Sequence, residues 1–312
     1  MTISGFTFIR NASRLYYPVE ESIRSILELV DEFVIAVGKG DPDDNTLEMI
    51  EGINSEKIKI IHTVWEPEKF PRLAEFARQT DIAKEHCTGD WLFYLQGDEV
   101  IHEDDHGIIK EACQKHLDNQ KVEGFLFKYL HFWGDYEHCF SNHCWYPREI
   151  RIIRNNPDIH SYKDAQSFRW MPDFDGINYM EPQNSRALRV IRIPARVFHY
   201  GWVRPPSTMQ TKKEHFAATR EGGHGNYQNL TEFDYGRMDR VPLYKGTHAS
   251  IMQDKIAQFD WKDSLRYEGP VAVGRKKAKH EQTKYRLIMW IEKYLLGGRL
   301  IGGFKNYKII QP

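Results

Sequence analysis

Short apolar runs alternate with helix-like patterns over the first hundred residues of the chain. Residues 6–9, 33–37 and 57–63 are predicted strands, because each is a short apolar run between polar or turn-forming segments. After the first run, Pro18 opens a stretch with apolar residues at positions 19, 23, 26, 27 and 30, the spacing of an amphipathic helix. This alternation predicts an α/β fold with a mixed, mainly parallel sheet flanked by helices.

A fourth predicted strand ends in acidic residues. The apolar run 90–95 follows a predicted helix over 72–88 and stops at Gln96-Gly97-Asp98-Glu99. Ligands of open α/β sheets bind at the carboxyl ends of the strands, and carboxylates there suit a divalent cation that neutralises a diphosphate. An ordinary turn whose carboxylate caps the helix predicted from Asp104 remains the structural alternative.

Beyond residue 120 the predicted strands become longer and more alternating. Residues 125–132, 149–154 and 190–199 are expected to extend the same sheet, and residues 203–265 to be mainly helical. We therefore predict one α/β domain over 1–202 and a helical, basic C-terminal extension over 203–312. Within the domain, residues 1–105 would form a nucleotide-binding half and residues 106–202 an acceptor half.

The charge of the chain is unevenly distributed. The 312 residues carry a formal net charge of −1, and 41% of them are hydrophobic, which is ample for a packed core. Residues 270–312 contain 10 Lys and Arg but only 2 Glu, so this tail has a net charge of +8 and residues 1–269 have a net charge of −9. The near-neutral total argues against nucleic acid as a partner. Residues 276–296 predict a basic amphipathic helix that contacts an anionic membrane surface, its own domain, or a second copy in a homodimer.

The cysteines do not indicate a disulfide framework. Cys87, Cys113, Cys139 and Cys144 are few and unevenly spaced, and we expect reduced thiols in a cytoplasmic protein without a leader or a membrane span. The stretch 138–144 holds four His and Cys side chains, but no second Cys pair follows at zinc-finger spacing. An aromatic loop near an acceptor is the preferred interpretation over a zinc site.

The first hundred residues resemble a known enzyme family. The segments Phe6-Thr7-Phe8-Ile9-Arg10-Asn11, 31–37, Asp43-Asp44-Asn45-Thr46 and 89–99 are similar to the nucleotide-binding half of family 2 glycosyltransferases, with their Rossmann-like GT-A fold. The resemblance covers residues 4–105. It implies transfer of a sugar from a nucleotide-diphospho-sugar to a glycan or lipid-linked acceptor, with inversion, in synthesis of a bacterial cell-surface polysaccharide. It further implies a cytoplasmic location, peripheral at the inner face of the membrane if the basic helix binds lipid.

The same resemblance assigns roles to individual residues. Asp98 and Glu99 match the end of the family's Asp-x-Asp motif and, with His199 of His199-Tyr200-Gly201, would bind Mg²⁺ or Mn²⁺. Gln96 stands where the family has its first Asp and would hold the ribose, so weaker metal binding and metal-independent binding both remain open. The donor's nucleoside and diphosphate would contact Arg10, Asp41, Asp43, Asp44 and Arg204, the last together with Lys212 and Lys213.

An inverting transfer needs a carboxylate that takes the proton of the acceptor hydroxyl. The resemblance places this base after the acceptor-side strand, which makes Asp164 the first candidate, and Asp173, Asp175 and Glu181 compete with it. Two other functions remain open at this point. A sugar nucleotidyltransferase would need a Gly-rich phosphate loop after the first strand, which residues 10–14 lack. A catalytically inactive nucleotide- or glycan-binding protein would explain the missing first Asp.

Overall fold

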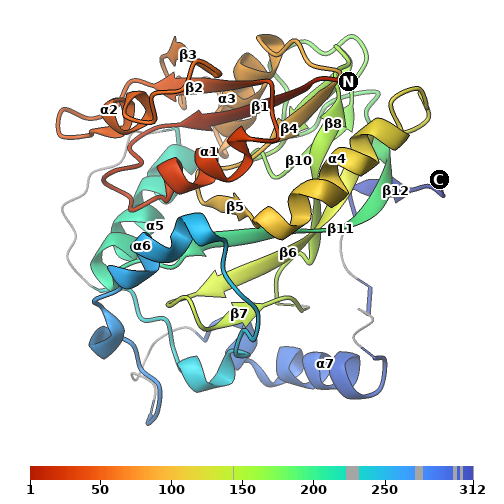
Figure 1. Ribbon diagram of the computed structural model, residues 1–312. Helices are drawn as coiled ribbons and strands as arrows, with labels where there is room; N and C mark the ends of the chain where they lie inside the picture. The colour runs from red at the N-terminus through yellow and green to blue at the C-terminus, as the bar shows by residue number, and fades with distance from the viewer. Residues whose placement is uncertain (143, 223–231, 271–276, 298–300, 303–304, 312) are drawn as a thin grey trace.

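The computed structural model describes the chain except for residues 143, 223–231, 271–276, 298–300, 303–304 and 312 (Figure 1). Its centre is a twelve-stranded mixed sheet with a main path in the order β3-β2-β1-β4-β8-β6-β11-β10-β9. The strands are β1 Ile3–Ile9, β2 Glu32–Gly38, β3 Ile58–Thr63, β4 Trp91–Tyr94, β5 Glu99–Ile101, β6 Gly124–Trp133, β7 Cys139–Phe140, β8 Arg148–Arg154, β9 Ile159–Tyr162, β10 Ser167–Trp170, β11 Arg186–Trp202 and β12 Tyr307–Ile309.

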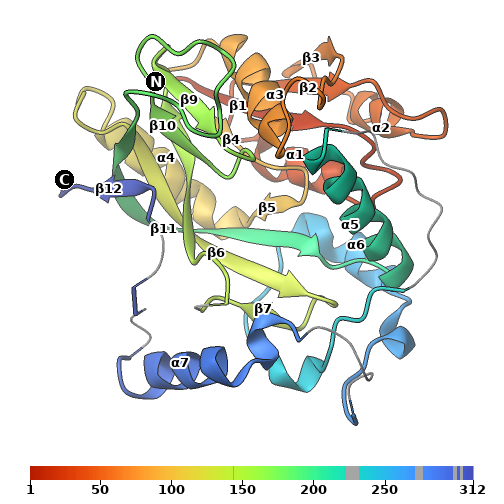
Figure 2. The same ribbon diagram turned by 180° about the vertical axis from the view of Figure 1, so that it is seen from behind.

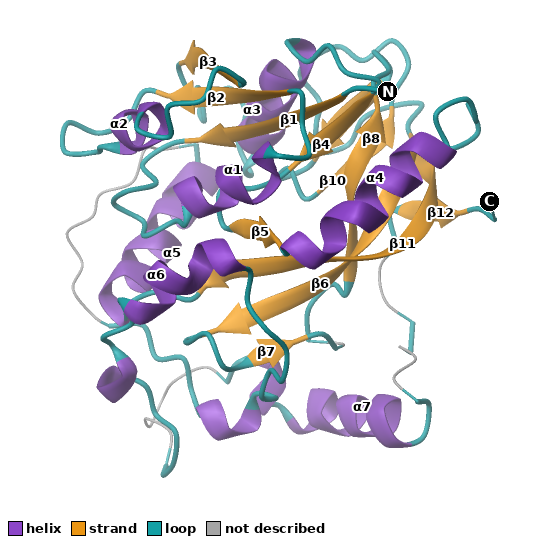
Figure 3. Cartoon of the chain, in the orientation of Figure 1, coloured by secondary structure: helices purple, strands orange, loops and turns teal. Residues whose placement is uncertain are grey.

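Helices lie on both sides of the parallel strands β1 to β4 (Figure 3). The helices of the described residues are α1 Val19–Leu27, α2 Thr46–Glu51, α3 Ala74–Glu85, α4 His106–Lys115, α5 Pro206–Arg220, α6 Gln253–Ala257 and α7 Thr283–Tyr294. Ile35 of β2 packs in a core with α1 and α4, whereas its neighbours Val34 and Ala36 pack in a second core with α3. Successive strand residues point to opposite faces, so a strand buried on both faces is apolar throughout. The predicted α/β sheet flanked by helices is confirmed.

The sheet changes character where β8 joins it. β8 runs antiparallel to both β4 and β6, and β6 then pairs in parallel with β11. The register of β11 shifts between Arg192 and Arg196, the stretch that holds Pro194. Proline has no N–H to donate to a neighbouring strand, so it interrupts the ladder locally. Beyond this irregularity β11 continues to residue 202, three residues past the end of the predicted strand.

The C-terminal region is helical, but it also returns to the sheet. α5, α6 and α7 follow β11, with short 3₁₀ segments at 238–240, 250–252, 262–264 and 279–281. β12 then pairs in parallel with β11, which the sequence analysis did not predict. Figures 1 and 2 show α7 at the end of the molecule remote from β1 to β3. No helix of the described residues is long and apolar enough to cross a membrane.

Candidate active site

A cavity of about 560 Å³ opens at the carboxyl ends of β1 and β4 and is closed on its other side by α5. It is the crevice expected from the parallel strands. Of the described residues that line it, Asp98 and Asp164 are acidic, whereas Arg10, Lys212, Lys213 and Arg220 are basic. The cavity therefore carries an excess of positive charge, which suits an anionic ligand.

Asp98 is the buried carboxylate of this cavity. It follows the turn after β4, and its backbone carbonyl accepts a hydrogen bond from the N–H of Tyr200 at 2.8 Å. Its Oδ2 lies 3.1 Å from Nζ of Lys212, which also donates to the carbonyl of Gly201 at 2.9 Å. Burial opposes ionisation, but the charge of Lys212, with a smaller contribution from Arg204, lowers the pKa of Asp98 below its usual value. Asp98 is therefore a stable carboxylate.

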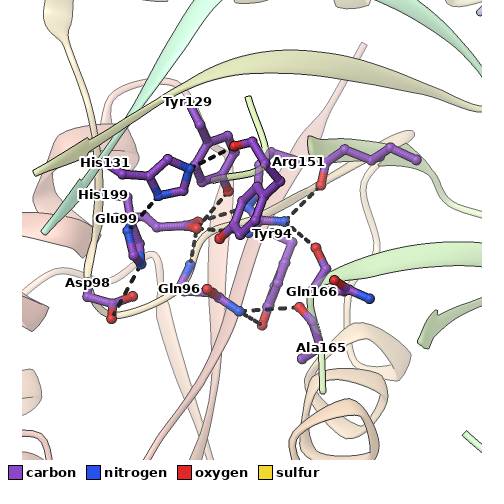
Figure 4. A network of polar contacts seen from close by, with 12 residues as sticks. Tyr94, Gln96, Asp98, Glu99, Tyr129, His131, Arg151, Ala165, Gln166 and His199 are labelled. Atoms are coloured by element: carbon purple, nitrogen blue, oxygen red, sulfur yellow. Dashed lines mark hydrogen bonds and ion pairs between the residues drawn. The ribbon is translucent and has the colours of Figure 1, made fainter. Parts of the chain in front are cut away.

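The imidazoles of His199 and His131 are hydrogen-bonded to each other beside Asp98 (Figure 4). Burial lowers the pKa of both imidazoles, so both are neutral. Nε2 of His131 lies 2.8 Å from the carbonyl oxygen of Tyr146 and therefore carries the proton, because a carbonyl can only accept. Nδ1 of the neutral His131 is then unprotonated and accepts a hydrogen bond from Nδ1–H of His199 at 3.1 Å. This leaves Nε2 of His199 with a free lone pair, 3.8 Å from Oδ2 of Asp98.

These groups fit a divalent cation. Gly201 keeps the space between them open, because a Cβ at this position would lie 2.5 Å from Nε2 of His199 and 2.7 Å from Oδ2 of Asp98. One carboxylate and one imidazole suit Mg²⁺ or Mn²⁺ that completes its shell with substrate phosphates. The described residues contain no group of three or more His, Cys, Asp or Glu side chains that could hold a metal.

Glu99, which the sequence analysis assigned to the metal, lies in a buried ion pair instead. Its two oxygens accept hydrogen bonds from Nε and Nη2 of Arg151, both at 2.8 Å, and Oε1 also accepts from the hydroxyl of Tyr129 at 2.6 Å (Figure 4). Both side chains are inaccessible to solvent. Since both of its oxygens already accept hydrogen bonds from the protein, Glu99 supports the wall of the site and is not available as a metal ligand.

Asp164 lies in the same cavity, on a loop with unusual backbone geometry. Lys163 and Ala165 on either side of it adopt left-handed φ angles of 57° and 59°, which cost energy for residues with a side chain. The carbonyl of Ala165 accepts a hydrogen bond from Nε2 of Gln96 at 3.2 Å, so the loop is tied to the end of β4. The Asp164 side chain is accessible to solvent, but the surrounding protein partly desolvates it and raises its pKa, with its own backbone N–H and then Arg220 opposing more weakly. A carboxylate with a raised pKa suits a general base.

The other base candidates lie outside the cavity. Asp173 is exposed, and Asp175 is exposed with its Oδ1 accepting from the backbone N–H of Ile177 and Asn178. Glu181 pairs with Arg72 at 3.5 Å. None of the three carboxylates is among the described residues that line the cavity.

The predicted nucleoside contacts divide into two groups. Arg10 lines the cavity, with its guanidinium 5.3 Å from the ring centre of Trp65. Asp41 and Asp43 instead pair with Arg14, at 2.7 and 3.0 Å. Asp44 accepts hydrogen bonds from the hydroxyls of Ser13 and Thr46. The three aspartates therefore brace the loop after β1, and the structure does not bring them to the cavity.

Arg204 lies behind the cavity wall. It is fully buried, donates to the carbonyl of Leu15 at 2.6 Å, and stacks 4.7 Å from the ring centre of Tyr17, which lines the cavity. Its Nε and Nη2 have no hydrogen-bond partner among the described residues. Arg204 thus supplies positive potential to Asp98 without reaching the ligand space.

Sequence reasoning missed three aromatic side chains and one histidine of the site. Phe8, Trp65 and Phe76 line one end of the cavity with ring centres 5.4 to 5.9 Å apart. Trp65 could have been noticed, because it follows a predicted strand in an otherwise polar stretch. His131 carried no such signal, since it lies inside an apolar strand. Trp145 and Tyr146, which directly follow the stretch 138–144 predicted to lie near an acceptor, also line the cavity.

The zinc alternative finds no support in the structure. His138 is held by Asp135 at 2.9 Å, and the four cysteines are buried and unpaired. His143 of this stretch lies outside the described residues.

Comparison with known proteins gives matches only among solved structures. No known protein family matches this sequence, and no curated protein matches it. TarS residues 1–349 of S. aureus, in complex with UDP, is 13% identical over 70% of this chain and 65% of its own, with a TM-score of 0.37. The same protein with UDP-GlcNAc is 17% identical over 42% and 35% of the two chains, with a TM-score of 0.30.

Glucosyl-3-phosphoglycerate synthase of Mycobacterium tuberculosis, in complex with Mn²⁺, UDP and phosphoglyceric acid, also matches. It is 16% identical over 42% of this chain and 43% of its own, with a TM-score of 0.29. This match and the one to TarS with UDP-GlcNAc span less than half of the solved chains. The function proposed below therefore rests on the site and on the sequence motifs around it.

Proposed function

We propose that this protein is a glycosyltransferase that moves a sugar from a nucleotide-diphospho-sugar to a hydroxyl of a glycan or lipid-linked acceptor, with inversion. One observation supports this function most directly. A single cavity at the carboxyl ends of the parallel strands combines the ionised Asp98, a second carboxylate at Asp164, and basic side chains including Lys212. Glycosyl transfer requires both kinds of group in one site: positive charge to stabilise the diphosphate leaving group, and a carboxylate to take the proton of the acceptor hydroxyl.

The transfer forms one bond and breaks another. The acceptor oxygen bonds to the anomeric carbon of the sugar, Asp164 takes the hydroxyl proton, and the bond from that carbon to the β-phosphate oxygen breaks. Its electron pair leaves with the nucleoside diphosphate, whose developing charge Lys212 and Arg220 stabilise. When bound at Asp98 and His199, Mg²⁺ or Mn²⁺ adds positive charge at the diphosphate.

The nucleoside is proposed to occupy the aromatic end of the cavity. Phe8, Trp65 and Phe76 offer apolar faces for a base, and Arg10 lies over Trp65. Gln96 at the end of β4 remains the proposed ribose contact. Trp145 and Tyr146 lie in the cavity wall as candidates for stacking on a sugar acceptor.

The remaining parts of the proposal concern organisation and location. Residues 1–202 are proposed as the catalytic domain, with the donor half over 1–105 and the acceptor half over 106–202, followed by the extension over 203–312. We place the enzyme in the cytoplasm, in the synthesis of a cell-surface polysaccharide, with no nucleic acid as a partner. A homodimer stays a proposal that gel filtration decides.

Nucleotide binding is the first test. UDP, GDP, CDP and dTDP sugars are added to the purified chain with and without Mn²⁺, and unfolding is followed by thermal shift. A ligand at about 100 times its Kd stabilises the folded state by about 2.7 kcal/mol, which raises Tm by roughly 5 °C in a chain of this size. We expect one nucleotide to give this shift, because the cavity is cationic and preformed.

Two variants sharpen this experiment. Asp98→Asn is expected to abolish the Mn²⁺-dependent part of the shift, whereas Asp43→Asn, at an exposed residue outside the cavity, leaves the shift unchanged. No shift with any nucleotide would refute the proposal. A shift without transfer to any acceptor favours the inactive binding protein that Gln96 made plausible, and release of pyrophosphate from a nucleoside triphosphate and a sugar phosphate favours the nucleotidyltransferase.

A further inference from the structure

Helix α7 has two apolar faces, and one of them is exposed. Toward the protein, Tyr285 and Met289 pack on the core around β6 and β7, with Sδ of Met289 3.4 Å from Sγ of Cys144. On the outer side lie four large apolar side chains, each between 51% and 65% exposed: Leu287, Trp290, Tyr294 and Leu295. A surface helix of a globular protein presents polar residues on its outer side. α7 departs from this rule.

The exposed face lies on this helix and continues into the residues that follow it, where Leu296 and Ile301 are also exposed. Leu287, Trp290 and Tyr294 are three and four residues apart, so they form one stripe along the helix, and Leu295 lies beside them. Away from this C-terminal segment, large exposed apolar side chains of the described residues occur singly, as at Ile177 and Leu243 on loops and Ile309 on β12. Single exposed apolar residues are normal, whereas a contiguous set marks a contact surface.

The exposed charges on α7 are all positive. Lys284, Arg286 and Lys293 are exposed, whereas Glu292 is 2% exposed and accepts a hydrogen bond from the backbone N–H of Ile301 at 2.8 Å. Glu281, just before the helix, is likewise buried, and its Oε2 accepts from the N–H of Ala278. Lys276, part of the predicted helix segment 276–296, lies outside the described residues.

We infer that the outer face of α7 binds an anionic membrane surface. Trp and Tyr prefer the boundary between headgroups and acyl chains, and leucines enter the acyl layer beside them. Basic side chains on the same helix attract anionic headgroups. A two-fold contact between the α7 helices of two copies is disfavoured, because it would gather the exposed cations of both helices with no exposed acidic side chain of α7 to pair with them. A lipid surface satisfies both the apolar stripe and the charge.

The orientation also suits the proposed acceptor. α7 lies at the end of the molecule remote from β1 to β3, which carry the nucleoside end of the cavity (Figure 2). A protein seated on a membrane through α7 thus keeps its nucleotide side in water. Binding to lipid does not depend on the proposed glycosyl transfer, so it is measured without donor or acceptor and its failure leaves the transfer activity to be judged separately.

Vesicle sedimentation with the full chain tests the inference. We expect the protein to sediment with vesicles of phosphatidylcholine mixed with phosphatidylglycerol, to stay in solution with phosphatidylcholine alone, and to be released by added salt, because salt screens the headgroup attraction. Trp290→Ser is expected to weaken binding about tenfold or more, from the loss of one apolar anchor. Lys293→Glu is expected to weaken binding at low salt and to change it little at high salt.

Ile177→Ser is the matched control, since Ile177 is 65% exposed on a loop away from α7. It is expected to bind vesicles as the wild type does, and far-ultraviolet circular dichroism checks that every variant is folded. The inference is overturned if the wild type ignores the mixed vesicles, or if Ile177→Ser and Trp290→Ser weaken binding equally. It is also overturned if gel filtration shows a dimer that Trp290→Ser dissociates, because α7 is then a contact between copies.

Discussion

Asp164→Asn is expected to lower kcat for sugar transfer by about 10²- to 10⁴-fold, the usual contribution of a positioned general base. The asparagine keeps the size of the side chain but cannot take the acceptor proton. The loop conformation should persist, because Gln96 still holds the carbonyl of Ala165. Steady-state kinetics with the nucleotide-sugar identified by thermal shift measures the loss, and nucleotide affinity is expected to stay within about threefold.

The pH profile separates a base from a structural residue. Partial desolvation in the cavity raises the pKa of Asp164 above its usual value although the side chain is accessible, so the active carboxylate form is lost as pH falls through that raised pKa. Wild-type kcat should therefore fall on the acid side, and the Asn variant should lack this dependence. Asp173→Asn is the matched control, because Asp173 is exposed and outside the cavity. Full activity of the Asp164 variant, or equal losses in both variants, would contradict the assignment.

Arg151→Met is expected to destabilise the folded protein by about 3–5 kcal/mol, since removing one partner of a buried ion pair leaves the other charge buried alone. Arg151 is inaccessible to solvent and donates two hydrogen bonds to Glu99 and one each to the carbonyls of Ile150 and Gln166. Methionine fills part of the volume but supplies no donor. Urea unfolding at pH 7 measures the change in free energy of unfolding.

The comparison for this variant is a surface ion pair of the same chemistry. Arg24 and Glu20 pair at 2.9 Å on α1, with both side chains partly exposed. Arg24→Met is expected to cost less than about 1 kcal/mol. The double variant Glu99→Gln/Arg151→Met should recover part of the lost stability, because the buried negative charge is also removed. If Arg151→Met were as mild as Arg24→Met, the pair would not stabilise the fold as argued.

Local pattern was sufficient for the parallel half of the sheet. Strands β1, β2 and β4 follow from short apolar runs, because a strand buried on both faces has no polar side to interrupt the run, and helix α1 follows from its helical spacing. Asp98 could be placed at the ligand edge for the same reason, since the end of a parallel strand is also an edge of the crevice. Its partner Lys212, predicted as a diphosphate contact, is buried against Asp98, a pairing across 114 residues that no local pattern indicates.

The remainder depended on contacts between distant segments. Glu99 looks like a second metal ligand in its motif, but Arg151, fifty-two residues later, binds both of its oxygens. Asp41 and Asp43 look like nucleoside contacts, but Arg14 on the neighbouring loop pairs with them. The sequence shows the chemical type of a side chain. Whether its oxygens remain available to a ligand depends on which donors the fold brings within about 3 Å of them.

The sequence by itself determined the α/β class, the positions of Asp98 and Asp164 as candidates, and the basic amphipathic segment near the C-terminus. The α/β class, the place of Asp98 at a strand end and the amphipathic segment are set by hydrophobic periodicity and residue type, which are local properties, whereas the choice of Asp164 came from the family resemblance. Only the tertiary structure decided that Asp98, His199 and Asp164 share one cavity and that His131 fixes the proton on His199. It also decided that an apolar face of α7 is exposed. The sequence pattern indicates which residues share a face of the helix, but it does not indicate which face packs on the protein.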